Sequence, residues 1–271
     1  MKMTLAGNAP EGRDRLVMHA AMEAGHILLE NGAEIDRVEE TMDRICRHFG
    51  VNNASFFVLS NGMFATDESQ YEYGGQFADV RHIPVHGARL DKVAGVNQLS
   101  REMEKGRYTP EELLEELKKV RTLPEKPRWL QVLASGIGSG CFCYLFGGGY
   151  SDCIGSLIAG LFLYLFFLFV EKGKLKKLMH AIVGGALVTC VCYACYYAGI
   201  GDSLNHMIVG AVIPLVPGVA FTNGIRDIAD GDYISGSVRL LDAILVIVCV
   251  AIGVGLVLTI AGGFTGGAVW N

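Results

Sequence analysis

Charged residues are scarce in the second half of this 271-residue sequence. Residues 129–271 contain six Lys or Arg and seven Asp or Glu, whereas residues 1–128 contain 17 and 21. A single soluble domain spreads its charges around one surface, so this asymmetry excludes that class. The hydrophobic fraction of 51% excludes intrinsic disorder, and the net charge of −5 leaves no basic surface for a nucleic acid partner.

The sequence also lacks the motifs of common enzyme active sites. It has no Gly-x-Ser-x-Gly turn, no phosphate-binding Walker loop and no His-Glu-x-x-His helix. Cys190, Cys192 and Cys195 have a metal-like spacing, but residue 190 does not share a helix face with the other two. His82 and His86 are separated by a proline, which disfavours the helix that such a metal pair needs. We therefore expect no enzyme, no cofactor and no metal site.

Long runs without charge fill the second half instead. A membrane-crossing helix needs about 20 mostly apolar residues, and five stretches reach roughly this length. They predict an all-α membrane domain of five transmembrane helices over residues 128–271, which follows a cytosolic α+β domain over residues 1–127. The predicted spans are 129–149, 152–170, 178–198, 204–222 and 238–261.

Basic residues between the predicted spans indicate their orientation. Four lysines lie between residues 172 and 177, Arg226 and Arg239 lie between the last two spans, and the other two turns contain no Lys or Arg. By the positive-inside rule, the N-terminal domain is cytoplasmic and the C-terminus lies outside a cell membrane that the chain crosses several times. Residues 1–10 have no apolar run, so we expect no cleaved leader.

The first half has the patterns of a compact α+β domain. Apolar residues recur at helical spacing, and Asn61-Gly62 is a strong hairpin signal. Thr109 and Glu112 form a capping-box pattern at the start of the last helix. The predicted elements are helices 13–31 and 35–49, strands 55–60, 63–66 and 76–85, and helices 90–105 and 110–122.

Residues 214–242 are the unusual part of the predicted membrane domain. Two prolines within one turn break the helical hydrogen bonding, and polar and charged residues follow directly. Unpaired backbone and charges cannot face lipid, and transporters use broken helices to expose backbone dipoles to a substrate. The alternative is a plain cytoplasmic loop after a proline kink. The candidate substrate-path residues are Pro214, Pro217, Gly218, Asn223, Arg226, Asp227, Asp230, Asp232 and Asp242.

Three stretches resemble the threonine/serine exporter family. They are GAEIDRVEETMDRI at 32–45, VNQLSRE at 96–102 and PLVPGVAFTNGIRDIADGDYISGSVRLLDA at 214–243. The resemblance covers about residues 13–260 and implies a cytosolic domain followed by membrane helices. With five predicted spans, the chain is similar to the split branch of the family, in which a second small membrane subunit supplies the other half. The first stretch adds candidate residues of a cytosolic-domain motif, namely Glu34, Arg37 and Glu39.

The resemblance implies export of amino acids or dicarboxylates. A zwitterion such as threonine or serine offers a carboxylate to Arg226 and an ammonium to the aspartates, whereas a dicarboxylate needs more positive charge than residues 214–242 contain. We expect a subunit of a secondary-active exporter of threonine or serine, which works with a second small membrane subunit and is compatible with a homo-oligomer. The alternatives are a succinate exporter subunit, a membrane-anchored sensor or scaffold, and a membrane-anchored hydrolase.

Overall fold

The computed structural model describes residues 10–67, 77–84, 87–170 and 176–264 of the chain. The chain divides into two compact units, which we describe separately. The first unit comprises Met1–Pro124 and Val219–Leu240, and the second comprises Glu125–Gly218 and Leu241–Asn271. The sequence pattern divides the chain once, near residue 127, whereas the structure also groups the charged stretch 219–240 with the N-terminal part.

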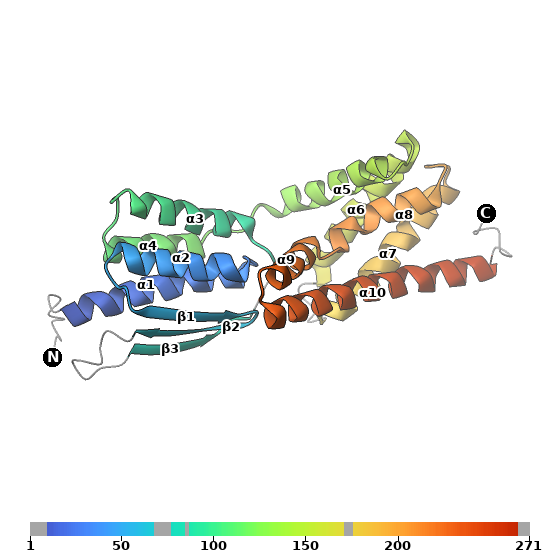
Figure 1. Ribbon diagram of the computed structural model, residues 1–271. Coiled ribbons are helices and arrows are strands. Elements are labelled where there is room, and N and C mark those ends of the chain that lie inside the picture. The colour runs from blue at the N-terminus through green and yellow to red at the C-terminus, as the bar shows by residue number, and fades with distance from the viewer. Residues whose placement is uncertain (1–9, 68–76, 85–86, 171–175, 265–271) are drawn as a thin grey trace, which may run out of the picture. The chain divides into compact units, whose positions relative to one another are not determined.

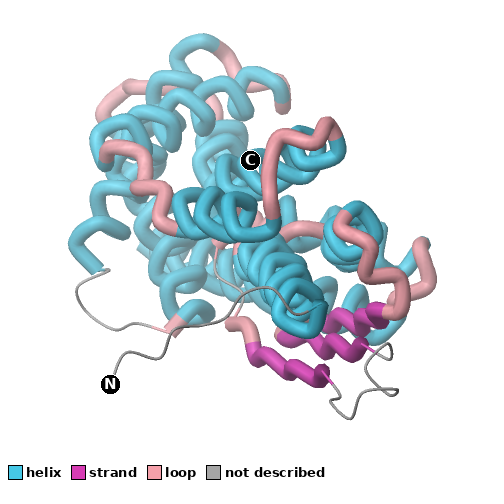
Figure 2. Tube along the Cα trace, turned by 90° about the vertical axis from the view of Figure 1, so that its left-hand side faces the viewer, coloured by secondary structure: helices cyan, strands magenta, loops and turns pink. Residues whose placement is uncertain are grey.

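The first unit contains a small antiparallel sheet with helices layered on it. Helix α2 packs on strand β1, α1 packs on α2, and α3 and α4 form a further layer (Figure 1). The three strands lie side by side in the order β1-β2-β3 (Figure 2). The elements are α1 (Pro10–Glu30), α2 (Ile35–His48), β1 (Ala54–Leu59), β2 (Gly62–Asp67), β3 (Phe77–His82), α3 (Leu90–Glu104) and α4 (Pro110–Arg121).

Helix α2 shows how the sequence pattern forms this core. Its apolar residues Ile35, Val38, Met42 and Ile45 lie on one face and are at most 1% exposed, since three- and four-residue steps keep them in line. Gly50 follows the helix with a positive φ of 89°, a conformation that glycine adopts without strain. The capping box predicted at α4 is confirmed, with both of its hydrogen bonds present.

The predicted hairpin is present, but its turn lies one residue earlier than expected. Leu59 pairs with Gly62, so the two turn residues are Ser60 and Asn61 and the glycine belongs to β2. A Cβ atom on Gly62 would lie 3.0 Å from the backbone oxygen of Arg81 in β3. Glycine is therefore needed here for the close approach of the neighbouring strand.

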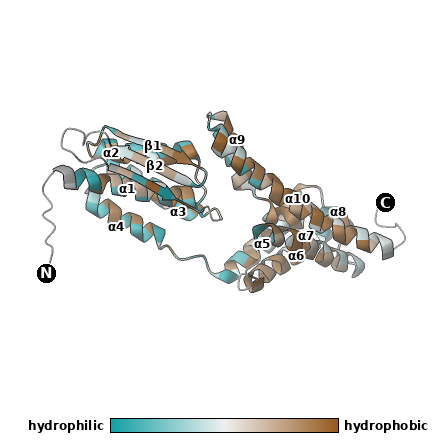
Figure 3. Cartoon of the chain, turned by 90° about the horizontal axis from the view of Figure 1, so that it is seen from below, coloured by the Kyte–Doolittle hydropathy of each residue, from teal (hydrophilic) through white to brown (hydrophobic). Residues whose placement is uncertain are grey.

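The second unit is a bundle of apolar helices. Helices α5 and α6 form its most extensive contact, and α7 and α8 pack against α6 (Figure 1). Figure 3 shows the mainly hydrophobic colouring of these helices. Its complete elements are α5 (Arg128–Leu145), α6 (Tyr150–Val170), α7 (Lys177–Tyr197), α8 (Leu204–Val212) and the 3₁₀ turn η3 (Ile213–Leu215). Helix α9 (Gly218–Ala229) falls almost entirely in the first unit, and α10 (Tyr233–Phe264) has residues in both.

Three described helices are long and apolar enough to cross a membrane, namely α6, α7 and α10. A fourth span results if the broken pair Leu204–Leu215 and Gly218–Ala229 counts as one. Helix α5, predicted as the first of five spans, is 18 residues long, contains Gln131, Ser135 and Ser139, and is not among them. The fifth span therefore stays a prediction.

Candidate functional site

The helix break expected at the two prolines is present in the structure. Helix α8 ends at Val212, Pro214 lies in the 3₁₀ turn, and α9 begins at Gly218 directly after Pro217. Proline removes a backbone donor and obstructs the preceding turn, so the helix cannot continue through these positions. A second break follows at Gly231, whose positive φ of 101° ends α9 and leads into α10. Helix α9 is thus a separate short element.

Helix α9 carries polar side chains that bind the residues just before α2. Asn223 Nδ2 donates to the backbone oxygen of Gly32 at 2.7 Å, and the guanidinium of Arg226 pairs with the Glu34 carboxylate. Both contacts lie within the first unit. The structure therefore joins the stretch at 32–45 to the stretch at 214–243, which are nearly 200 residues apart in the sequence.

Asp227 caps the N-terminus of α2. Its Oδ1 accepts a hydrogen bond from the backbone N–H of Ile35 at 3.3 Å, whereas the N-cap residue, Glu34, makes no capping hydrogen bond with its own side chain. The first amides of a helix have no partner within it, and the helix dipole favours a negative charge there. A residue of α9 thus caps α2.

The other oxygen of Asp227 forms a buried ion pair. Arg239 Nη1 donates to Asp227 Oδ2 at 3.0 Å, and the two side chains are 9% and 2% exposed. Among the described residues, Arg239 Nη2 is buried without a hydrogen-bond partner. A buried pair tolerates the loss of neither member well, because the remaining charge is then uncompensated. The pair therefore fixes α9 to the beginning of α10.

Two glycines let α9 and α10 approach closely enough for this pair. A Cβ atom on Gly236 would lie 2.8 Å from the backbone oxygen of Gly224, and one on Gly224 would lie 3.1 Å from the oxygen of Gly236. Side chains at these positions would push the two helices apart. Glycine is therefore needed at positions 224 and 236 for the packing between α9 and α10.

Two further carboxylates, Glu39 and Asp232, lie near these contacts. We call the group the Asp227 cluster; it consists of Glu34, Glu39, Asn223, Arg226, Asp227, Asp232 and Arg239. Glu39 Oε1 accepts the backbone N–H of Val58 in β1 at 2.8 Å. Burial raises the pKa of Glu39 above its ordinary value, the Val58 hydrogen bond opposes this, and the nearby negative charge of Asp232 adds to the increase. The residues around the start of α2 thus contain more carboxylates than guanidinium groups.

The remaining predicted residues lie apart from this cluster. Arg37 and Asp230 are exposed on α2 and at the end of α9. Pro214, Pro217 and Gly218 belong to the second unit, as does Asp242, which pairs with Lys177 at the start of α7.

Two buried charged residues, Arg239 and Asp152, are not among the candidates predicted from the sequence. Arg239 could have been found as the one basic residue within the predicted fifth span, 238–261. Asp152 is 3% exposed, and its carboxylate accepts the backbone N–H groups of Gly149, Asp202 and Ser203 at 2.9, 2.7 and 2.8 Å. It ties the turn before α6 to the loop before α8. The signal was a single aspartate in a long apolar stretch.

Metal ligands do not gather at any of these places. No group of three or more His, Cys, Asp or Glu side chains that could hold an ion occurs within the described part of the chain. His82 lies at the end of β3, and His86 lies outside the described residues.

Comparisons with known proteins agree with the two joined stretches. A family model described as "Putative threonine/serine exporter" (ThrE) matches residues 19–261. Two similar proteins are named "Probable succinate transporter subunit YjjP", and both are 23% identical to this chain. The one from Klebsiella aerogenes aligns over 94% of this chain and 97% of its own length, and the one from Escherichia coli K12 over 92% and 96%. No solved structure matches. The chain belongs to the threonine/serine exporter family.

Proposed function

We propose that this chain is one subunit of a secondary-active exporter of small carboxylate-containing metabolites. The observation that carries the proposal is the ion-pair cluster at Asp227. It joins the stretches 32–45 and 214–243, which resemble the exporter family, within one unit. Family membership and the apolar helices make the chain a membrane protein of a transporter family. In this proposal the first unit faces the cytoplasm and the C-terminus lies outside.

The broken helix is the proposed substrate path. Pro214, Pro217 and Gly218 lie at the break between α8 and α9, and transporters with discontinuous helices bind substrates at such breaks. Arg226 is the proposed receiver of the substrate carboxylate. Its side chain is 58% exposed and holds Glu34 in a pair that a substrate carboxylate can replace at little cost, because exposed pairs contribute about 0–1 kcal/mol.

The aspartates are the proposed receivers of the ammonium group or of a coupling proton. Asp227, Asp230, Asp232 and Asp242 lie in or next to the interrupted helices, and Asp227 is the buried one. The sequence contains no ATP-binding loop, so we propose that an ion gradient or the substrate gradient drives export.

Threonine or serine is the first proposed substrate, and succinate is the second. The two arginines of the cluster both already face carboxylates, which leaves little positive charge for a dicarboxylate. The names of the two relatives favour succinate instead, and they also describe transporter subunits. We therefore propose a second small membrane subunit as partner for either substrate.

Efflux from cells tests the proposal and separates the two substrates. Cells loaded with labelled threonine, serine or succinate would express the chain alone, or the chain with a small membrane protein encoded next to it. We expect efflux only from the pair, and loss of efflux in Arg226→Gln and Asp232→Asn. Arg47→Gln is the matched control, because Arg47 forms a similarly exposed pair with Asp43 away from the cluster. Equal efflux with and without Arg226, at equal membrane abundance, would refute the proposed path.

A further inference from the structure

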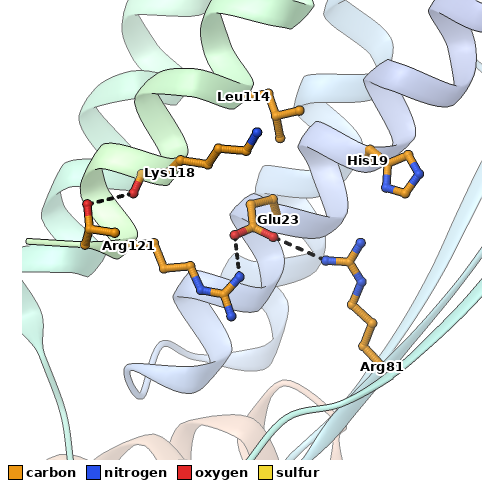
Figure 4. A pocket seen from close by; sticks show the side chains of 7 residues that line it. His19, Glu23, Arg81, Leu114, Lys118 and Arg121 are labelled. Atoms are coloured by element: carbon orange, nitrogen blue, oxygen red, sulfur yellow. Dashed lines mark hydrogen bonds and ion pairs between the residues drawn. The ribbon is translucent and has the colours of Figure 1, made fainter. Parts of the chain in front are cut away.

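A pocket in the first unit lies among residues that the proposed function does not use. It has a volume of about 320 Å³ and opens between α1, β3 and α4 (Figure 4). His19 and Glu23 come from α1, Arg81 from β3, and Lys118 and Arg121 from α4. None of these residues belongs to the cluster around Asp227. The volume is at the small end of the range for sites that bind small molecules.

Cationic side chains outnumber carboxylates around this pocket. Glu23 is the one carboxylate among the lining residues, and it holds two arginines, with Oε1 2.7 Å from Arg121 Nη1 and Oε2 3.4 Å from Arg81 Nη1. Arg81 also reaches Asp79 at 3.0 Å, outside the pocket lining. Each guanidinium has five N–H donors, so one shared carboxylate leaves donors unused.

Lys118 is the unpaired cation of the pocket. Its ammonium group points across the pocket towards α1 in Figure 4, and it forms no ion pair with any residue that the structure describes. The neighbouring Lys119, by contrast, pairs with Glu116. An unpaired lysine next to two arginines that share one carboxylate creates a local surplus of positive charge.

The titration of His26, next to the pocket, is consistent with this surplus. Its pKa is lowered first by burial and then by the positive charge of Arg121, whose Nη2 lies 3.3 Å from His26 Nε2. The carboxylates of Glu23 and Glu30 act in the opposite direction, and Arg81 adds to the lowering. Burial and the two arginines together outweigh the carboxylates at this position.

The walls of the pocket favour an organic ligand over a bare inorganic ion. Leu114 lines it, and the aliphatic stems of Lys118 and Arg121 provide further apolar surface below their charged ends. Apolar walls with a few convergent polar groups are typical of small-molecule sites. A short carbon chain with a carboxylate at each end matches both features.

We propose that this pocket is a regulatory site for a small organic dicarboxylate on the first unit. One carboxylate is held by Lys118, the other by the unused donors of Arg81 and Arg121, and the carbon chain lies against Leu114. None of the lining residues belongs to the proposed substrate path, so the pocket is a second site, and its regulatory role rests on the proposed export function.

Calorimetry on the full-length protein in detergent at low ionic strength tests the site, with succinate as the probe. We expect succinate binding to weaken about tenfold in Lys118→Gln, the loss expected for one charge-assisted hydrogen bond. Lys119→Gln is the matched control, because it removes an equal charge one residue away from the pocket, and we expect less than a twofold change. An equal loss in both variants, or no binding to the wild type, would overturn the proposal.

Further binding measurements, with other ligands and with two more variants, identify the ligand chemistry and the site. Inorganic phosphate and acetate should bind more weakly than succinate; phosphate binding as tight as succinate binding would overturn the assignment to an organic dicarboxylate. Glu23→Gln removes the competing carboxylate and should tighten succinate binding several-fold, and weaker binding would contradict the geometry. Arg226→Gln should retain the Lys118-dependent binding, so a failure of the proposed export route leaves this test intact.

Discussion

At the scale of single residues, Asp227 connects three elements. One oxygen caps α2 at Ile35, and the other pairs with Arg239 at the start of α10. The contribution of such a residue to the free energy of unfolding depends on burial, because an unpaired buried charge costs far more than an exposed one. Substitutions of buried residues in this cluster should therefore lower the free energy of unfolding much more than substitutions of exposed ones.

The first prediction compares Asp227→Ala with Asp230→Ala. Asp227→Ala leaves Arg239 buried without its partner and α2 without its cap, so we expect the free energy of unfolding to fall by about 3–5 kcal/mol. Asp230 is exposed at the end of the same helix, and we expect a change within about 0.5 kcal/mol. Urea or thermal unfolding in detergent measures both. Similar losses in the two variants would contradict the assigned role of Asp227.

The second prediction concerns the pH dependence contributed by Glu39. Its pKa is raised from an ordinary value of 4.5, mainly by burial, so the folded chain binds this proton more tightly than the unfolded chain does. The resulting stabilisation is complete below pH 4.5 and is lost as the pH rises through the raised pKa. Glu39→Gln keeps an oxygen for the Val58 N–H and removes the charge. We therefore expect a melting temperature at neutral pH at or above that of the wild type.

Melting curves from acidic to neutral pH check this expectation. The decline of the melting temperature with rising pH should be smaller in Glu39→Gln than in the wild type. Glu40→Gln is the control, since Glu40 lies on the exposed side of α2 and pairs with Arg44. A lower melting temperature of Glu39→Gln at neutral pH would show that the charged form is the stabilising one.

At the scale of elements, periodicity and caps were predictable and contacts distant in sequence were not. The helix of residues 35–49 follows from three- and four-residue spacing, and the capping box at α4 follows from Thr109 and Glu112. The turn of the hairpin was misplaced by one residue, because the Asn-Gly pattern carries no information about the approach of β3 to Gly62. Asp227 and Arg226 were named from the sequence. Glu34 was named as well, but its pairing with Arg226 and the contact of Asp227 with Ile35 could not be predicted, because no local pattern relates positions 192 residues apart.

The third prediction tests the contact between α7 and α10 in the second unit. A Cβ atom on Gly185 would lie 2.6 Å from the backbone oxygen of Val250, and backbone cannot move aside as a flexible side chain can. Gly185→Ala should lower the free energy of unfolding by about 1–3 kcal/mol. Gly255→Ala, with nothing within 4 Å, should be neutral or stabilising by up to ~1 kcal/mol, since alanine favours the helix. Protease resistance in detergent compares them. Equal resistance would show that the two helices separate easily.

At the scale of the whole molecule, the number of membrane spans decides where the C-terminus lies. Helices α6, α7 and α10 and the broken pair α8–α9 give at most four spans by length and composition. An even number places both termini on one side of the membrane, and a fifth span at α5 places them on opposite sides. Where the broken pair α8–α9 counts as one span, the parity of the spans tests the role of α5, whose 18 residues include Gln131, Ser135 and Ser139.

The fourth prediction is that the termini lie on opposite sides, with α5 inserted. Two of its three polar side chains have partners within the bundle: Ser135 Oγ donates to the Gly160 oxygen at 2.9 Å, and Gln131 accepts from Tyr164, whereas Ser139 Oγ has none among the described residues. Such pairing removes much of the cost of placing these groups in a membrane. A C-terminal alkaline phosphatase fusion should be active and a green fluorescent protein fusion dark, with the reverse at the N-terminus. Fluorescence at both ends would show an even number of spans and would contradict the five-span arrangement.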